Sequence, residues 1–237
     1  MIIPNALSEK VGYRKQRPHR IEGLADGVFA IAMTLLVLDI RLPAGEMHTL
    51  NKLELLWSFG PKILTFILSF TAAGLFWTVL TNHFNYIYTS DRNENVIAIF
   101  YLLFVSLLPF STSFLSEHLY SRVAVGFYIF NLVIILLIAL LHWNYAYHSG
   151  LIKVEGGQEI LIHKAMIRRS RVVLTAYAIV AGCCFFSSKL ALCGIIVLQF
   201  IFTFSGFFEM FQSRKNKKNS DVKLQTSQSN KILPSCP

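Results

Sequence analysis

Apolar residues along this chain gather into about six long runs, which short polar segments separate. The runs lie at about 21–41, 55–82, 96–116, 122–147, 166–187 and 189–211. A helix that spans a bilayer needs roughly 20 mainly apolar residues, and each run has about that length. The pattern therefore predicts an all-α, polytopic membrane protein with six transmembrane helices and no soluble domain.

The segments on either side of these runs are short and basic. We expect residues 1–19 to form a basic cytoplasmic segment, 20–211 the transmembrane domain, and 212–237 a disordered basic cytoplasmic tail. The first residues lack the basic, apolar and small order of a signal peptide, so we expect the first helix to be retained.

Charge placement predicts the orientation of these helices. Lys and Arg number 22 against 13 Asp and Glu, which gives a net charge of +9. With six spans, seventeen of the 22 basic residues fall on the side of the two termini. Cytoplasmic loops carry such an excess, so we expect both termini in the cytoplasm and the protein in the cell membrane. Insertion explains the excess and no recognition motif accompanies it, so nucleic-acid binding is not indicated.

Several short motifs that mark metal sites and hydrolases are absent from the sequence. The four cysteines form no CxxC pair, and neither an HExxH nor a GxSxG motif occurs. We therefore expect no enzymatic activity, no metal site and no cofactor. The TVGYG loop of potassium-selective filters is absent as well.

Within the first run, one helical face combines small, branched and hydroxyl side chains. Positions 27, 31, 34, 35 and 38 recur at spacings of three and four residues and share this face. Around a symmetry axis, Ile31, Leu35 and Leu38 would form a dry constriction and Thr34 a layer of hydroxyl oxygens. Ordinary packing against neighbouring helices is the alternative, because one stripe does not identify what it faces.

Charged residues stand at both ends of the same run. Arg20, Glu22 and Asp26 open it, where an anion is favoured by the helix dipole. They are candidates for an ionic element that fixes this helix, and helix capping is the alternative. Asp39 could attract cations at an outer mouth, or pair with Arg41 in solvent.

The first run resembles a known family of membrane proteins. Arg20-x-x-x-Leu24-Ala25-Asp26 and the following GVFAIAMTLLVLDIRLP are similar to the first helix of the endosomal/lysosomal transmembrane potassium channel family and its prokaryotic members, which carry Arg-x-x-x-Phe-Ser-Asp there. Phe76-Trp77, Phe84, Asp91 and the LLPFSTSFL segment at 107–115 extend the resemblance.

The resemblance implies a homotetramer in the lipid bilayer whose first helix lines the pore. Potassium would be the conducted ion, with H⁺, Na⁺ and Cs⁺ as further candidates. The constriction would fall on Ile31, Leu35 and Leu38, with Thr34 as the selectivity layer. Arg20, Asp26 and Trp77 would form a structural network at the inner end of this helix.

Several positions depart from the family pattern. Leu24 and Ala25 replace its phenylalanine and serine, and Leu80 and Ala98 stand where a histidine and an asparagine are usual. The joint replacement of these polar residues is consistent with hydrogen bonds among them in the family, because removing one alone would leave the others without a hydrogen-bond partner. We expect apolar packing in their place.

Three functional hypotheses follow from the sequence. The first is a passive, weakly selective potassium channel. The second is a proton leak pathway or a secondary transporter in which Asp26 or Glu22 titrates. The third is a non-conducting membrane scaffold.

Overall fold

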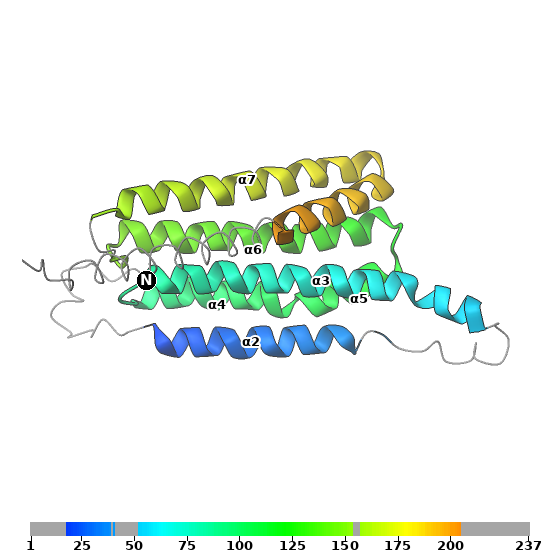
Figure 1. The fold of residues 1–237 in the computed structure, drawn as a ribbon, viewed down its shortest axis with the longest axis horizontal. Coiled ribbons are helices and arrows are strands. Elements are labelled where there is room, and N and C mark those ends of the chain that lie inside the picture. The colour runs from blue at the N-terminus through cyan, green and yellow to red at the C-terminus, as the bar shows by residue number, and fades with distance from the viewer. Residues whose placement is uncertain (1–17, 39, 41–51, 154–156, 205–237) are drawn as a thin grey trace, which may run out of the picture. The chain divides into compact units, whose positions relative to one another are not determined.

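The fold of this chain, a computed structural model, is described for residues 18–38, 40, 52–153 and 157–204, and for the backbone alone at 52–58. Helices dominate it: α2 (His19–Val37), α3 (Lys52–Tyr86), α4 (Arg92–Ser106), α5 (Leu108–Glu117), α6 (Arg122–His148) and α7 (Glu159–Phe186) (Figure 1). A further helix covers Ser188–Phe204. The described residues also contain an antiparallel bridge between Ile87 and Ile152.

Each apolar run predicted from the sequence contains a helix. Four segments are long and apolar enough to cross a membrane: Phe59–Tyr86, Arg92–Glu117, Arg122–His148 and Glu159–Phe186. Helix α2 is also long, at 19 residues, but its first turns carry Arg20, Glu22 and Asp26. The all-helical membrane fold is therefore confirmed.

A proline divides the third run into two helices. Helix α4 ends at Ser106 and α5 begins at Leu108, with Pro109 in its first turn. Proline has no backbone N–H and its ring clashes with the carbonyl four residues earlier, so a helix interior breaks or kinks there. The hydroxyls of Ser111 and Thr112 donate to the Leu108 carbonyl at 2.9 and 2.7 Å, within α5.

Helix α2 packs along α3, α4 and α5, on the side away from α7 (Figure 1). Its buried residues recur at spacings of three and four and form one stripe: Ile21, Ala25, Phe29, Ala32 and Leu36. Such a stripe is what a helix buries when it packs by a single face. The aromatic ring of Phe29 meets that of Tyr101 on α4, with 6.3 Å between ring centroids.

Helix α6 lies between α7 and the other helices and buries the longest series of side chains. Polar groups along it are joined by hydrogen bonds across helices. The hydroxyl oxygens of Ser69 and Tyr128 lie 3.1 Å apart, those of Thr112 and Ser69 lie 2.7 Å apart, and the Asn131 amide donates to Ser111 at 3.2 Å. Hydrocarbon offers these groups no water, so the protein itself supplies these partners.

A short pairing joins the segment after α3 to the segment after α6. The Tyr88 amide donates to the Leu151 carbonyl at 3.0 Å, and the Lys153 amide donates to the Tyr86 carbonyl at 3.3 Å. Gly150 makes the turn with a φ of 64°, where glycine avoids the clash that a Cβ would cause. This pairing fixes the ends of α3, α4 and α6 beside one another.

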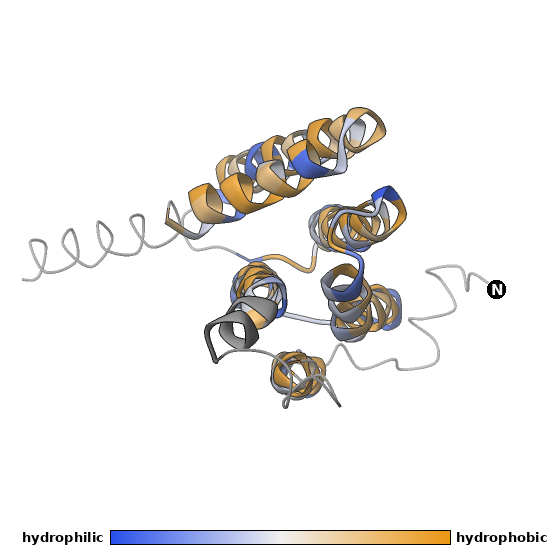
Figure 2. Cartoon of the chain, turned by 90° about the vertical axis from the view of Figure 1, so that its right-hand side faces the viewer, coloured by the Kyte–Doolittle hydropathy of each residue, from blue (hydrophilic) through white to orange (hydrophobic). Residues whose placement is uncertain are grey.

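The outward faces of the helices are apolar as well. Viewed along the helices, hydrophobic residues surround most of them (Figure 2), and large side chains such as Phe130, Ile179 and Phe185 are exposed. A soluble protein rarely exposes so much apolar surface, whereas lipid tails accept it. The compact unit ends at Ile196, and residues 197–204 are described only as helix.

Candidate functional site

The face of α2 opposite its buried stripe is apolar and uncovered. Ile31 is 62% exposed, Leu35 44% and Leu38 59%, whereas Ala32 and Leu36 between them are buried. The three side chains predicted to form a constriction therefore lie together on the outward face of this helix. Side chains on this exposed face can meet lipid or another copy of the chain.

A single hydroxyl lies among these apolar side chains. Thr34 is exposed, and its Oγ1 donates to the Ile31 carbonyl at 2.9 Å. This bond uses the hydroxyl hydrogen within the helix and leaves the oxygen lone pairs available to a cation. Asp39, the candidate for an outer mouth, lies outside the described residues.

The charged residues at the start of α2 make contacts other than an ion pair between Arg20 and Asp26. The Trp77 indole Nε1 on α3 donates to Asp26 Oδ1 at 2.8 Å, which joins the two helices. His19 Nδ1 lies 3.6 Å from Glu22 Oε2. Arg20 is exposed within the helix and forms no salt bridge with Asp26 among the described side chains.

The positions that depart from the family pattern are mostly buried. Ala25, Leu80 and Ala98 are at most 3% exposed and belong to the core, whereas Leu24 is half exposed. Apolar packing therefore occupies the three positions at which the resemblance would place a polar cluster.

A different polar cluster lies close by, and the sequence reasoning did not find it. The carboxyl of Glu94, at the start of α4, meets His142 on α6, which in turn meets His83 on α3. All three side chains are buried. The partners are 48 and 59 residues apart in sequence, so no local motif signals them.

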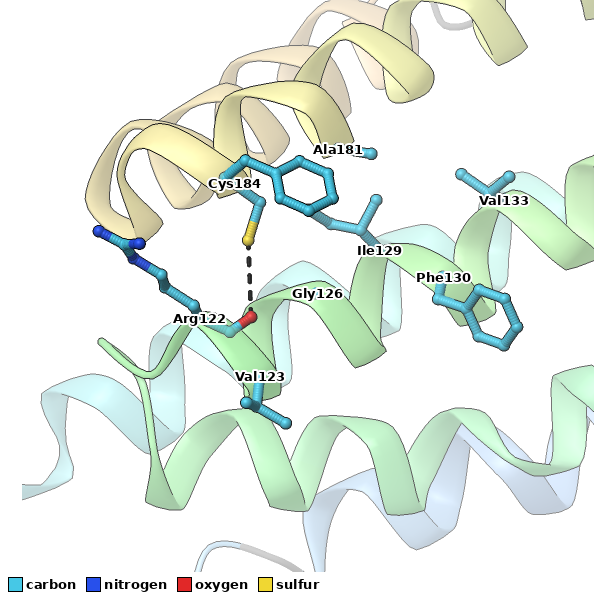
Figure 3. A pocket seen from close by; sticks show the side chains of 9 residues that line it. Arg122, Val123, Gly126, Ile129, Phe130, Val133, Ala181 and Cys184 are labelled. Atoms are coloured by element: carbon cyan, nitrogen blue, oxygen red, sulfur yellow. Dashed lines mark hydrogen bonds between the residues drawn. The ribbon is translucent and has the colours of Figure 1, made fainter.

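A crevice of about 420 Å³ lies between α6 and α7 (Figure 3). Its walls are mainly apolar, and the exposed Arg122 lies at one end, where the Cys184 thiol is 3.5 Å from the Arg122 carbonyl oxygen. The crevice is lined by Arg122, Val123, Gly126, Ile129, Phe130, Val133, Ala181, Cys184 and Phe185. Helix α2 contributes no residue to it, so it is separate from the α2 face.

Comparison with known sequences identifies relatives of the first half of the chain. Residues 20–109 match the family described as endosomal/lysosomal potassium channel TMEM175. A potassium channel of Chamaesiphon minutus is 37% identical over 118 residues, which are 46% of this chain and 56% of that protein. A potassium channel of Streptomyces collinus is 33% identical, over 42% of this chain and 48% of its own. The matches thus span about half the length of these curated relatives.

A vertebrate relative and a solved structure extend the comparison. The endosomal/lysosomal proton channel TMEM175 of Gallus gallus is 36% identical over 105 residues, which are 41% of this chain and 21% of that protein. The crystal structure of a lysosomal potassium-selective channel TMEM175 homolog from Chamaesiphon minutus superposes with a TM-score of 0.71 at 27% identity. That match covers 79% of this chain and 96% of the other. The chain is therefore similar to the TMEM175 family in the sequence of residues 20–109 and shares the fold of the solved homolog.

Proposed function

We propose that this chain forms a potassium channel in which four copies surround a pore lined by α2. Two observations support the proposal. The bacterial relatives are named potassium channels, and α2 buries one face while it leaves an apolar face uncovered. Conduction would be passive and weakly selective, because the sequence has no carbonyl filter of the TVGYG type.

The side chains of the uncovered face suit a gate in such a pore. Around a four-fold axis, Ile31, Leu35 and Leu38 would each be repeated as a ring, and a narrow apolar ring closes a pore by excluding water. The Thr34 oxygens would replace part of the hydration shell of a passing cation. The uncovered Ile31, next to the buried Ala32, is the observation that carries the proposal.

We infer further that the channel lies in the cell membrane with both termini in the cytoplasm. The support is the unequal distribution of Lys and Arg, seventeen of 22 on the side of the termini. Basic residues in short loops favour retention on the cytoplasmic side.

Potassium flux into proteoliposomes tests the proposal. A flux that follows the potassium gradient without a coupled ion is expected, and strict coupling to another ion would contradict a channel. Ile31→Asn and Leu35→Asn should each raise the flux, because an amide in the ring lowers the cost of wetting the constriction. Ile179→Asn on α7 is the matched control, since Ile179 is similarly exposed at 68%. No change with either α2 variant would remove the pore from this helix.

Proton conduction is the second candidate function. It is favoured by the vertebrate relatives, which are named proton channels, and by the exposed carboxylate of Asp26 on the pore-lining helix. A pH-sensitive dye inside the vesicles would report a proton current, and Asp26→Asn should reduce it if that carboxylate carries the proton. A scaffold protein would show neither current.

A further inference from the structure

Three titratable side chains that the proposed pore does not use are buried together between α3, α4 and α6. Glu94 and His142 have no exposed surface, and His83 is 2% exposed. The His142 Nε2 lies 2.8 Å from Glu94 Oε1, and the His142 Nδ1 lies 3.2 Å from His83 Nδ1. Ionisable groups at this depth are costly, so they are retained mainly where they serve a function or an assembly.

These two distances restrict where the protons can lie. A hydrogen bond between two ring nitrogens needs one hydrogen, so one Nδ1 carries a proton and the other accepts. The contact between His142 Nε2 and the carboxyl likewise needs one hydrogen. The middle ring, His142, therefore couples the protonation of Glu94 to that of His83.

Two arrangements satisfy both contacts and differ by one proton. In the first, Glu94 is ionised, His142 is protonated at Nε2, and His83 donates from Nδ1, so the cluster carries one negative charge. In the second, a proton is added at Nε2 of His83, and the hydrogen between the two rings passes from His83 Nδ1 to His142 Nδ1. His142 then donates from Nδ1 to the bare Nδ1 of His83, the hydrogen between His142 Nε2 and the carboxyl is shared by these two groups, and the cluster is neutral.

Other polar groups surround the Glu94 carboxyl, but His142 remains its basic partner. The Ser90 hydroxyl lies 2.5 Å from Glu94 Oε2 and 2.9 Å from the amide oxygen of Asn95. Asp91 Oδ1 accepts from the Glu94 backbone N–H, and Asp91 Oδ2 accepts from the Tyr145 hydroxyl. Within the described residues, His142 is the basic group at salt-bridge distance from Glu94.

The other titratable groups on the surrounding helices are engaged elsewhere or exposed. On α7, His163 stacks on Tyr147 with 3.7 Å between ring centroids. After α6, Lys153 lies over the ring of Tyr88. Arg92 on α4 and His148 on α6 are exposed, and the buried Tyr101 on α4 donates to the Phe76 carbonyl. On α2, His19 lies near Glu22, Arg20 is exposed, and Asp26 accepts from Trp77.

We propose that Glu94, His142 and His83 form a binding site for one exchangeable proton. The proton comes from water and adds at His83 Nε2, while the hydrogen between the rings passes from His83 to His142, without any redox change. Its binding reverses the hydrogen bond between the two rings, which belong to different helices, and so makes the contact of α3 with α6 depend on pH. The site is separate from the α2 face, and it does not require that the chain conduct ions.

Nitrogen-15 NMR of the full chain in nanodiscs, with labelled histidine, tests the site. As the pH falls, the protonated nitrogen of His83 should change from Nδ1 to Nε2, while His142 changes at the same midpoint. Glu94→Gln should abolish the change at His83, because the amide cannot take up the proton. Glu22→Gln, which removes a half-buried carboxyl from α2, is the matched control and should leave the change intact.

The wild-type spectrum by itself can overturn the proposal. It fails if His83 keeps the same protonated nitrogen at every pH at which the chain is folded, or if the two rings titrate at unrelated midpoints. It also fails if Glu94→Gln leaves the change in place. Should that variant not fold, Ser90→Ala tests the same point, because loss of a donor to the carboxylate should move the shared midpoint to higher pH. Potassium flux is not measured, so failure here leaves the proposed channel untouched.

Discussion

The indole of Trp77 and the carboxylate of Asp26 connect two helices through one polar contact of 2.8 Å. A hydrogen bond to a charged group contributes more than a neutral one, about 1.5–3 kcal/mol when it is sheltered from water. Asp26 is exposed, so water can replace the indole when the contact is lost. The contact should therefore contribute near the lower end of that range.

Replacing Trp77 with phenylalanine should lower the free energy of unfolding by about 1.5 kcal/mol beyond the effect of reduced ring size. A double-mutant cycle with Asp26→Asn and Asp26→Ala separates the two effects, with thermal unfolding in detergent as the measurement. Asparagine keeps an acceptor oxygen and should retain much of the coupling to Trp77, whereas alanine should remove it. Equal coupling in the two cycles would mean that the hydrogen bond does not join the helices.

At the scale of single residues, the sequence predicted which face of a helix a residue lies on better than it predicted which residue that side chain contacts. The helical period places Ile31 and Leu35 on one face, and the structure places both on the outward face of α2. The partner of Glu94 could not be predicted, because His142 approaches it only when α4 and α6 pack. The cluster lies about one helical turn from Leu80 and Ala98, the positions where the resemblance placed polar residues.

At the scale of the helix, α2 has two faces with different requirements. Its buried stripe is complementary to α3, α4 and α5, and Phe29, only 2% exposed, is its largest side chain. The residues two positions after each member of this stripe are exposed, on the opposite face of the helix. Stability within one chain should therefore depend on the buried face, and conduction on the exposed one.

Phe29→Ala should destabilise the chain by about 3–5 kcal/mol, because it removes a buried ring and leaves a cavity beside Tyr101. Ile31→Ala should change the unfolding temperature of the detergent-solubilised chain little, since the Ile31 side chain is mostly exposed. Thermal unfolding of both variants is the measurement. Similar losses would mean that α2 does not pack by the face described here.

The helix boundaries show which parts of an element the sequence determines. Hydrophobic length predicted each helix, because a span must be both long and apolar. The sequence predicted the ends of the helices less well. Helix α7 begins seven residues before the predicted 166, because a polar stretch that includes Glu159 and Lys164 extends it. The third run, predicted as one span, changes helix at Leu107, just before Pro109.

At the scale of the whole molecule, one copy of α2 cannot enclose a pore. The exposed face of Ile31, Leu35 and Leu38 belongs to a single helix at the side of its bundle (Figure 1). Closed symmetry would bring the same face of each copy to a common axis, and rings of identical residues would result. The proposed channel therefore requires that several copies of the chain assemble with their α2 faces together, and this assembly can be tested on the purified protein.

Cross-linking between copies measures that assembly directly. In a background without Cys183, Cys184, Cys193 and Cys236, a cysteine at Leu24 or Ile31 should be joined between copies by a short bifunctional thiol reagent. The product should be two linked chains, because each chain has one thiol, which reacts once, and a neighbouring α2 lies within reach around the axis. A cysteine at Ile179, which is as exposed as Ile31 but lies on α7, should give far less product, since α7 would face lipid. Equal cross-linking at both helices would indicate random collision and would remove the four-fold axis along α2.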